Sequence, residues 1–119
     1  MAFTQNDKEK FLAALIDTRS SAQSGEIRLR FQGNTAEADQ VSQACDRLTD
    51  QIDTLTAQLM DDWLGAANKA IADLDKRSGA VDDAVAAIKK QVKIAQTVVK
   101  LTGAIDDAVA IAKKALLAL

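Results

Sequence analysis

The sequence predicts an all-α protein: an elongated antiparallel bundle of three or four helices, completed by self-association. Hydrophobic residues make up 48% of the 119 positions, yet the chain has no Pro, no Tyr, three Phe and one Trp. This composition is typical of a helical protein built from Ala, Leu, Val and Ile. Its apolar residues recur at steps of three and four, as on one face of a helix. At this length we expect one helical domain over residues 1–119.

The last forty residues contain a near-repeat. Residues 78–90 (SGAVDDAVAAIKK) align with residues 102–114 (TGAIDDAVAIAKK), with nine identities in thirteen positions. Each copy is typical of a helix start, with a hydroxyl residue as cap, two early Asp and two later Lys. Gly103 costs about 1 kcal/mol against Ala within a helix. We therefore expect a basic segment over 79–119, either one helix or a helix pair, with a break near 102–103.

The apolar stripe of that segment gives candidate interface residues. Its first half carries Val81, Val85, Ile88, Val92, Ala95 and Val99, and its second half Ile105, Val109, Ala112, Leu116 and Leu119. Because one thin hairpin cannot cover both flanks of such helices, we expect a second copy to cover them. The predicted interface residues are Leu59, Trp63, Val92, Val99, Leu116 and Leu119.

The N-terminal third predicts a short helix over residues 6–24, followed by a linker or extended segment over 25–33. Asn6 and Glu9 have the spacing of a capping box. Residues 26–32 (EIRLRFQ) alternate polar and apolar side chains between two glycines, as a strand does. No other segment offers a partner strand. The segment is therefore either helical or a strand paired with another subunit.

Residues 34–77 predict one long acidic helix. Asn34 and Glu37 form a second capping signature, and Lys76 with Arg77 would complement the C-terminal dipole before a Gly79 cap. At 1.5 Å per residue the helix would extend about 60 Å. Its apolar track comprises Val41, Cys45, Leu48, Ile52, Leu55 and Leu59, continuing to Trp63.

Charge is unevenly distributed along the chain. Residues 1–33 carry a net charge of +1, residues 34–77 of −5 and residues 78–119 of +2. In an antiparallel hairpin, the acidic middle segment and the basic last segment would face each other. Exposed ion pairs contribute about 0 to 1 kcal/mol each, so they select register more than they stabilise.

The residue inventory argues against catalysis. There is no His, which removes the commonest general base and most transition-metal sites. The three Asp-Asp pairs are adjacent on helices, where neighbouring side chains diverge by about 100° and do not converge on one ion. The near-neutral charge disfavours nucleic acid as a partner. We expect no enzyme activity, no catalytic residue, no metal and no cofactor.

Two sequence features suggest contacts with other molecules. Arg28, Arg30 and Phe31 form the one compact basic and aromatic cluster, suited to an acidic partner or an anion. Lys89, Lys90, Lys93 and Lys100 lie near Val and Ala. They fit against the acidic middle helix, which we favour, or on an anionic membrane.

Trp63-Leu64-Gly65 resembles the Trp-x-Gly motif at the bend of certain small secreted helical-hairpin proteins. The resemblance covers three residues. The C-terminal tyrosine of that family's export motif has no counterpart here, because the chain has no Tyr. More residues also precede Trp63 than in that family, so Trp63 is expected to anchor a core or a subunit interface.

The sequence thus favours a non-catalytic helical module for protein–protein interaction, of the scaffold or adaptor type, that self-associates as a dimer. The alternative is a membrane-active or exported small helical protein that uses its amphipathic C-terminal segment. The single Cys45 lies on an apolar stripe and indicates a buried thiol. Without a signal-like or membrane-spanning run, a cytoplasmic location is the default expectation, and export without a leader is compatible with it.

Overall fold

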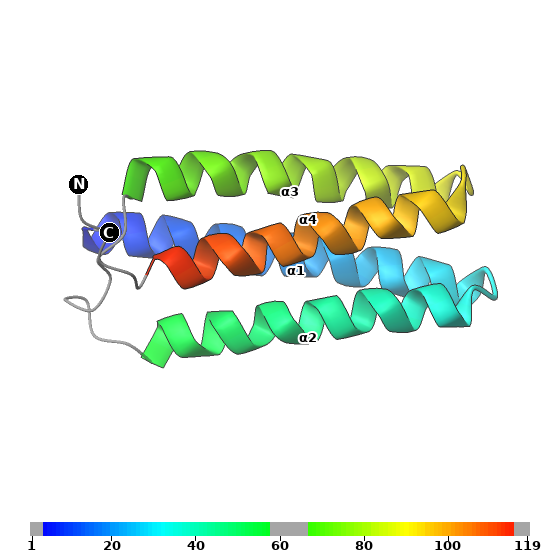
Figure 1. Ribbon diagram of the computed structural model, residues 1–119, viewed down its shortest axis with the longest axis horizontal. Helices are drawn as coiled ribbons and strands as arrows, with labels where there is room; N and C mark the ends of the chain where they lie inside the picture. The colour runs from blue at the N-terminus through cyan, green and yellow to red at the C-terminus, as the bar shows by residue number, and fades with distance from the viewer. Residues whose placement is uncertain (1–3, 58–66, 116–119) are drawn as a thin grey trace.

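The computed structural model describes residues 4–57 and 67–115 and has four helices (Figure 1). The helices are α1 (Gln5–Phe31), α2 (Thr35–Ala57), α3 (Ala67–Lys89) and α4 (Ile94–Lys114). The described residues include no strand. The predicted all-α bundle is confirmed, with four helices.

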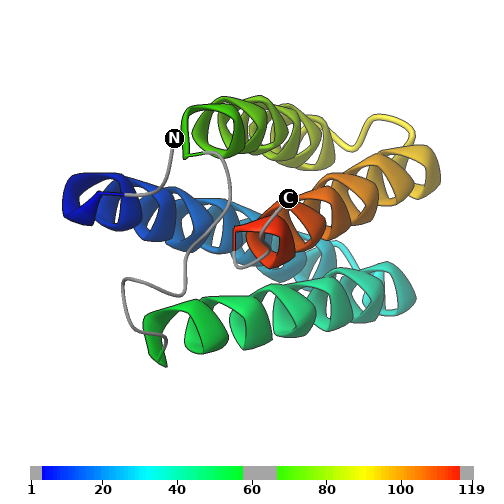
Figure 2. The same cartoon turned by 60° about the vertical axis from the view of Figure 1, so that its left-hand side comes forward.

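The bundle consists of two helical hairpins side by side. The α1–α2 turn and the α3–α4 turn lie at the same end (Figures 1 and 2). Helix α1 packs against α2 and α3, and α4 packs against the same two helices. Helices α2 and α3 therefore occupy opposite corners of the bundle. The molecule measures 45 × 22 × 21 Å.

The apolar stripes of all four helices form one continuous core. Seven of the largest fully buried side chains are Leu or Phe, drawn from every helix. The predicted stripe of the middle segment is confirmed from Val41 to Leu55. The seven are Phe11, Leu15, Leu29, Leu48, Leu55, Leu74 and Leu101.

The N-terminal prediction was too short. Helix α1 continues past Gly25 to Phe31, so the helical alternative for residues 26–32 is confirmed up to Phe31, and the linker and the strand are wrong. Its cap is Thr4, not Asn6: the Thr4 hydroxyl accepts from the Asp7 amide at 3.1 Å, and the Asp7 carboxylate accepts from the Thr4 amide at 3.1 Å. The hydrogen bond from the Thr4 backbone lowers the pKa of Asp7. The strand-like alternation fails because a lone strand would leave its backbone groups unpaired, whereas a helix satisfies them locally.

The single helix predicted over residues 34–77 is also wrong. Helices α2 and α3 run in opposite directions (Figure 1), and the residues between Ala57 and Ala67 lie outside the described part of the chain. Lys76 and Arg77 do not end a helix, and Gly79 lies within α3, which continues to Lys89. Two antiparallel helices bury the two halves of the apolar track in one compact core, which a straight helix of about 60 Å does not.

The break predicted near 102–103 lies ten residues earlier. Helix α3 ends at Lys89, α4 begins at Ile94, and Gly103 lies inside α4. Both copies of the repeat are therefore the C-terminal parts of their helices, and their Lys pairs lie at helix ends. Because the chain leaves the helical conformation between α3 and α4, the apolar stripe of α4 does not continue that of α3. Consequently Val98, Leu101 and Ile105 are buried, whereas Val92, Ala95 and Val99 are exposed.

The two turns use the same backbone geometry with different residues. After α1, the Gly33 amide donates to Arg30 O (3.1 Å) and the Asn34 amide to Leu29 O (2.9 Å), with Gly33 at φ +82°. After α3, the Gln91 amide donates to Ile88 O and the Val92 amide to Ala87 O, both at 3.0 Å. This is the Schellman pattern, in which the residue after the cap adopts a left-handed conformation. Gln91 adopts it at φ +57°, which is unfavourable for a residue with a Cβ.

We expect exchanges at these two positions to act in opposite directions. Gln91→Gly should raise the free energy of unfolding by about 0.5 to 1 kcal/mol, because glycine adopts the left-handed conformation without the Cβ penalty. Gly33→Ala should lower it by about 1 kcal/mol, although no atom lies within 4 Å of the added Cβ. Urea unfolding followed by circular dichroism measures both. A stabilising Gly33→Ala or a destabilising Gln91→Gly would contradict this account of the turns.

Candidate interaction surfaces

Helix α1 has a second apolar stripe that faces away from the core. We define the α1 outer face as Ala13, Ile16, Ser20, Gln23, Ser24, Ile27 and Phe31, all of which are exposed. These residues recur at steps of three and four, and no charged side chain interrupts them. The exposed fractions are 40% for Ile16, 55% for Ile27 and 82% for Phe31. The outward side of a bundle helix normally carries charged and polar residues, so this face is unusual.

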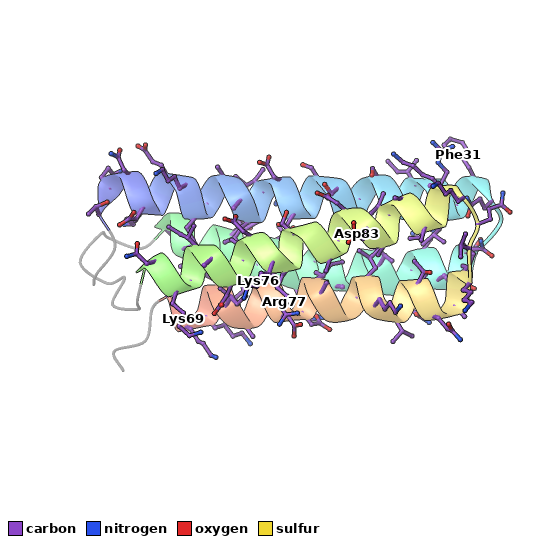
Figure 3. All side chains as sticks on the ribbon, turned by 90° about the horizontal axis from the view of Figure 1, so that it is seen from above. Phe31, Lys69, Lys76, Arg77 and Asp83 are labelled. Atoms are coloured by element: carbon purple, nitrogen blue, oxygen red, sulfur yellow. The ribbon has the colours of Figure 1, made fainter. Side chains whose placement is uncertain are left out.

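A shallow groove lies at the C-terminal end of this face. Its volume is about 260 Å³, and it is lined by Ser24, Ile27, Arg28, Phe31 and Lys89. Phe31 projects from the bundle near the end with the two turns (Figure 3). The Gln32 side-chain amide donates to Ile88 O at 2.8 Å, which joins the ends of α1 and α3 beside the groove. The groove thus combines an apolar lining with two cationic side chains.

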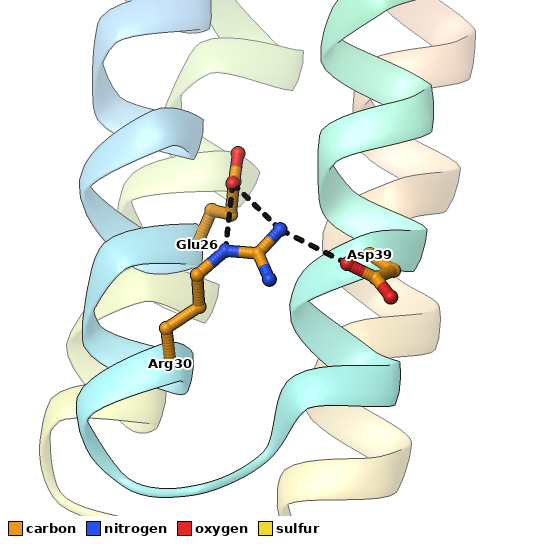
Figure 4. A network of polar contacts seen from close by, with 3 residues as sticks. All are labelled: Glu26, Arg30 and Asp39. Atoms are coloured by element: carbon orange, nitrogen blue, oxygen red, sulfur yellow. Dashed lines mark hydrogen bonds and ion pairs between the residues drawn. The ribbon is translucent and has the colours of Figure 1, made fainter.

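The predicted cluster of Arg28, Arg30 and Phe31 is divided by the fold. Arg28 and Phe31 line the same groove, whereas Arg30 forms ion pairs with Glu26 at 3.1 Å and Asp39 at 3.0 Å (Figure 4). The hydrogen bonds that Arg30 donates to Asp39 and Glu26 raise the pKa of its guanidinium. Arg30 therefore joins α1 to α2. Of the two arginines, Arg28 is the one positioned to bind an acidic group from outside.

The four lysines that we expected to lie against the acidic middle helix, Lys89, Lys90, Lys93 and Lys100, form no ion pair with it in the described residues. Helix α3, which ends at Lys89, lies diagonally opposite α2. Lys89, Lys90 and Lys93 are exposed and form no ion pair within the described ranges. Two apolar residues predicted for an interface are also exposed in this region, Val92 at 48% and Val99 at 67%.

The ion pairs between the middle and last segments have the opposite polarity to the one predicted. Arg47 of α2 donates to Asp106 of α4, with Nε and Oδ1 2.9 Å apart. Arg77 of α3 lies 3.5 Å from Asp107 of α4. In both pairs the acidic segment supplies the cation. All four side chains are about half exposed, so these pairs contribute little to stability.

A second groove, of about 530 Å³, follows the contact between α3 and α4. Small residues form much of its lining, including Ala80, Ala84 and Gly103. Asp83, Lys100 and the Arg77–Asp107 pair supply charges of both signs. Figure 3 shows Arg77 and Asp83 along α3. Its mixed charge and small side chains do not single out a ligand class.

The one thiol is buried, as predicted. Cys45 is 3% exposed, and its burial raises the pKa of the thiol to about 11, with smaller contributions from Glu26 and Asp46. A reactive cysteine would instead need a lowered pKa and access to solvent. No group of three or more Cys, Asp or Glu side chains in the described ranges is arranged to hold a metal ion.

Four of the predicted interface residues lie outside the described part of the chain: Leu59, Trp63, Leu116 and Leu119. Ala115, the last residue that the structure describes, is fully buried. The interface predictions for these four residues stay predictions.

The α1 outer face was not recognised from the sequence. Ile27 and Phe31 belong to the segment whose polar and apolar residues alternate as in a strand, so the sequence pattern did not place them on a helix with Ile16. A single helix over residues 5–31 would have revealed two opposite apolar faces, with Phe11, Leu15 and Leu29 on one and Ile16, Ile27 and Phe31 on the other.

Comparison of the chain with protein-family models, with curated proteins and with solved structures found no match. Among the described helices, none has the length and apolar character needed to cross a membrane. The function is therefore inferred from surface geometry and chemistry.

Proposed function

We propose that this chain is a non-catalytic interaction module of the scaffold or adaptor type, and that it self-associates through the α1 outer face. The observation that supports this is the alignment of Ile16, Ile27 and Phe31. They are three of the five large hydrophobic residues exposed in the described part of the chain. Exposed apolar patches on soluble proteins mark contact sites with other molecules.

The surface that would form the dimer differs from the one that the sequence suggested. The sequence suggested a second copy because a thin hairpin would leave its helix flanks uncovered. Four helices of one copy now share a single core, so the main stripes need no partner. What a partner would cover is the outer face of α1. Burying side chains of this size contributes about 1.5 to 3 kcal/mol each when burial is complete.

Replacing Phe31 by Ser should weaken the dimer at least tenfold. Phe31 is 82% exposed in one copy, so its removal leaves the core intact, while each dimer loses two aromatic contacts. Sedimentation equilibrium at tens of micromolar should give twice the chain mass of 12.7 kDa for the wild type and a lower average mass for Phe31→Ser.

Val99→Ser is the matched control, because Val99 is 67% exposed on α4, which lies diagonally across the bundle from α1. It should leave the mass unchanged. Dissociation by Val99→Ser and not by Phe31→Ser would move the interface to the surface originally predicted with Val92 and Val99. A monomeric wild type at these concentrations would contradict self-association altogether.

A second candidate function is binding to an anionic membrane through the α3–α4 turn. It is favoured by the exposed Val92 and Val99 beside Lys89, Lys90 and Lys93, which form no ion pair in the described ranges. Basic residues beside apolar ones are typical of interfacial membrane binding. The apolar face of α4, however, is buried in the bundle from Val98 to Ala112, so using it as an anchor requires the bundle to open.

Co-sedimentation with vesicles distinguishes the two functions. The interaction module should stay in the supernatant with vesicles of phosphatidylcholine and with vesicles containing phosphatidylserine. Binding to the anionic vesicles alone, abolished by Lys90→Glu with Lys93→Glu, would favour the membrane function instead.

A further inference from the structure

We propose that two copies pair through antiparallel α1 helices, so that Ile16 and Asp17 of each copy enter the groove at the end of α1 in the other. This inference rests on the proposed self-association and specifies its geometry. The groove lies at one end of the α1 outer face. Ile16 and Asp17, whose side chains complement the groove in chemistry, lie toward the other end.

The groove favours an apolar side chain next to a carboxylate. Ile27 and Phe31 supply its apolar lining, while Arg28 and Lys89 supply positive charge. Neither cation forms an ion pair within residues 4–57 and 67–115. No acidic residue lines the groove. A carboxylate brought to it would therefore meet two available cations.

The α1 helix carries such a combination about three turns away. Ile16 is 40% exposed on the α1 outer face, and Asp17 is exposed beside it. Asp17 forms no ion pair in the described structure. Asp17 and Arg28 are eleven residues apart, which is close to three full turns, so both lie on the same flank of the face.

An antiparallel pairing with its two-fold axis between residues 22 and 23 brings each of these groups to a partner in the other copy. Asp17 then lies opposite Arg28 of the second copy, and Ile16 lies opposite the interval between Ile27 and Phe31. Each contact occurs twice, because a two-fold interface is self-complementary.

The small residues of the face suit the same register. Ser20 falls within one residue of Ser24 near the axis, and Ala13 falls within one residue of Phe31. Small side chains at these points allow the two helix axes to approach to the usual 8 to 10 Å. A parallel pairing would instead place each residue at the level of its own copy, so Asp17 could not reach Arg28 of the partner and both grooves would stay unfilled.

Charge exchange tests the register. Asp17→Arg and Arg28→Asp should each raise the dissociation constant about tenfold, because each places two like-charged pairs in the interface. The double variant restores opposite charges in the exchanged order and should return the constant to within about threefold of the wild-type value. A double variant that stays as weak as the single variants would overturn the register. Circular dichroism melting checks that all three variants fold.

Cross-linking tests the direction. Gln23→Cys lies beside the proposed axis and should form a disulfide-linked dimer on mild oxidation, whereas two copies of Ala13→Cys would be separated by about 30 Å along the helices and should not. The wild type, whose Cys45 is buried, is the background control.

The positions that cross-link distinguish a parallel pair, an antiparallel pair and a dimer formed elsewhere on the surface. Cross-linking at both positions would show a parallel pair and overturn the inference. Cross-linking at neither position, with the dimer mass retained, would overturn the α1 geometry while self-association stands. A monomeric wild type would remove the proposed function itself.

Discussion

Replacing Gly25 by Leu is expected to lower the free energy of unfolding by about 3 kcal/mol, because the new side chain has no room between the helices. A Cβ at this position would lie 3.1 Å from Val85 Cγ2, 3.5 Å from Leu101 Cδ2 and 3.6 Å from Ile88 Cδ1. At Gly25, therefore, α1 packs closely against side chains of both α3 and α4. Urea unfolding measures the loss.

Gly103→Leu is the matched control for this prediction. Gly103 is also helical, but nothing lies within 4 Å of an added Cβ, so the substitution should stabilise by a few tenths to about 1 kcal/mol through helix propensity alone. Adding Val85→Ala to Gly25→Leu should cost less than the sum of the two single changes, since it removes the nearest contact. Equal stability of Gly25→Leu and Gly103→Leu would contradict the close packing.

The second large effect concerns Cys45. Burial raises the pKa of the thiol from 9.0 to about 11, so the thiolate fraction near pH 8 is about a hundredfold below that of an ordinary cysteine. Alkylation by iodoacetamide should be at least a hundredfold slower in the folded protein than in urea. Equal rates in the two states would mean that the thiol is not buried in solution.

The same pKa shift makes stability depend on pH. The folded state holds the Cys45 proton more tightly than the unfolded state, so this contribution is fully present below about pH 9 and is lost as the pH rises through about 11. The wild type should therefore lose more stability than Cys45→Ala between these values, by up to about 3 kcal/mol. Parallel pH profiles of the two proteins would contradict the shift.

Much of the core could be predicted from the spacing of apolar residues. Val41, Cys45, Leu48, Ile52 and Leu55 recur at helical steps, and all five are buried. The same rule failed for Val92 and Val99, because it assumed a continuous phase across a helix break. The α1 outer face was not predicted either, because residues 25–33 were interpreted as a linker or extended segment, although Ile27 and Phe31 lie on helix α1.

Glycine was the least reliable signal in the sequence. Gly25, Gly79 and Gly103 each suggested a boundary, yet all three lie inside helices. Gly25 lies at a close approach of neighbouring helices, which depends on Val85, sixty positions away. The actual break after α3 uses Gln91 and Lys93 in left-handed conformations, at φ +57° and +44°. No local rule favours those residues there.

The sequence by itself determined that the chain is helical and which residues of its strongest stripe are buried, because helix periodicity is a local property of the backbone. Only the tertiary structure decided where the helices end and which apolar residues stay outside. Covering the face from Val98 to Ala112 against the other helices outweighs the cost of about 1 kcal/mol for Gly103 within α4 and the strain at Gln91. That balance depends on contacts between distant segments, and it left Ile16, Ile27 and Phe31 on the surface.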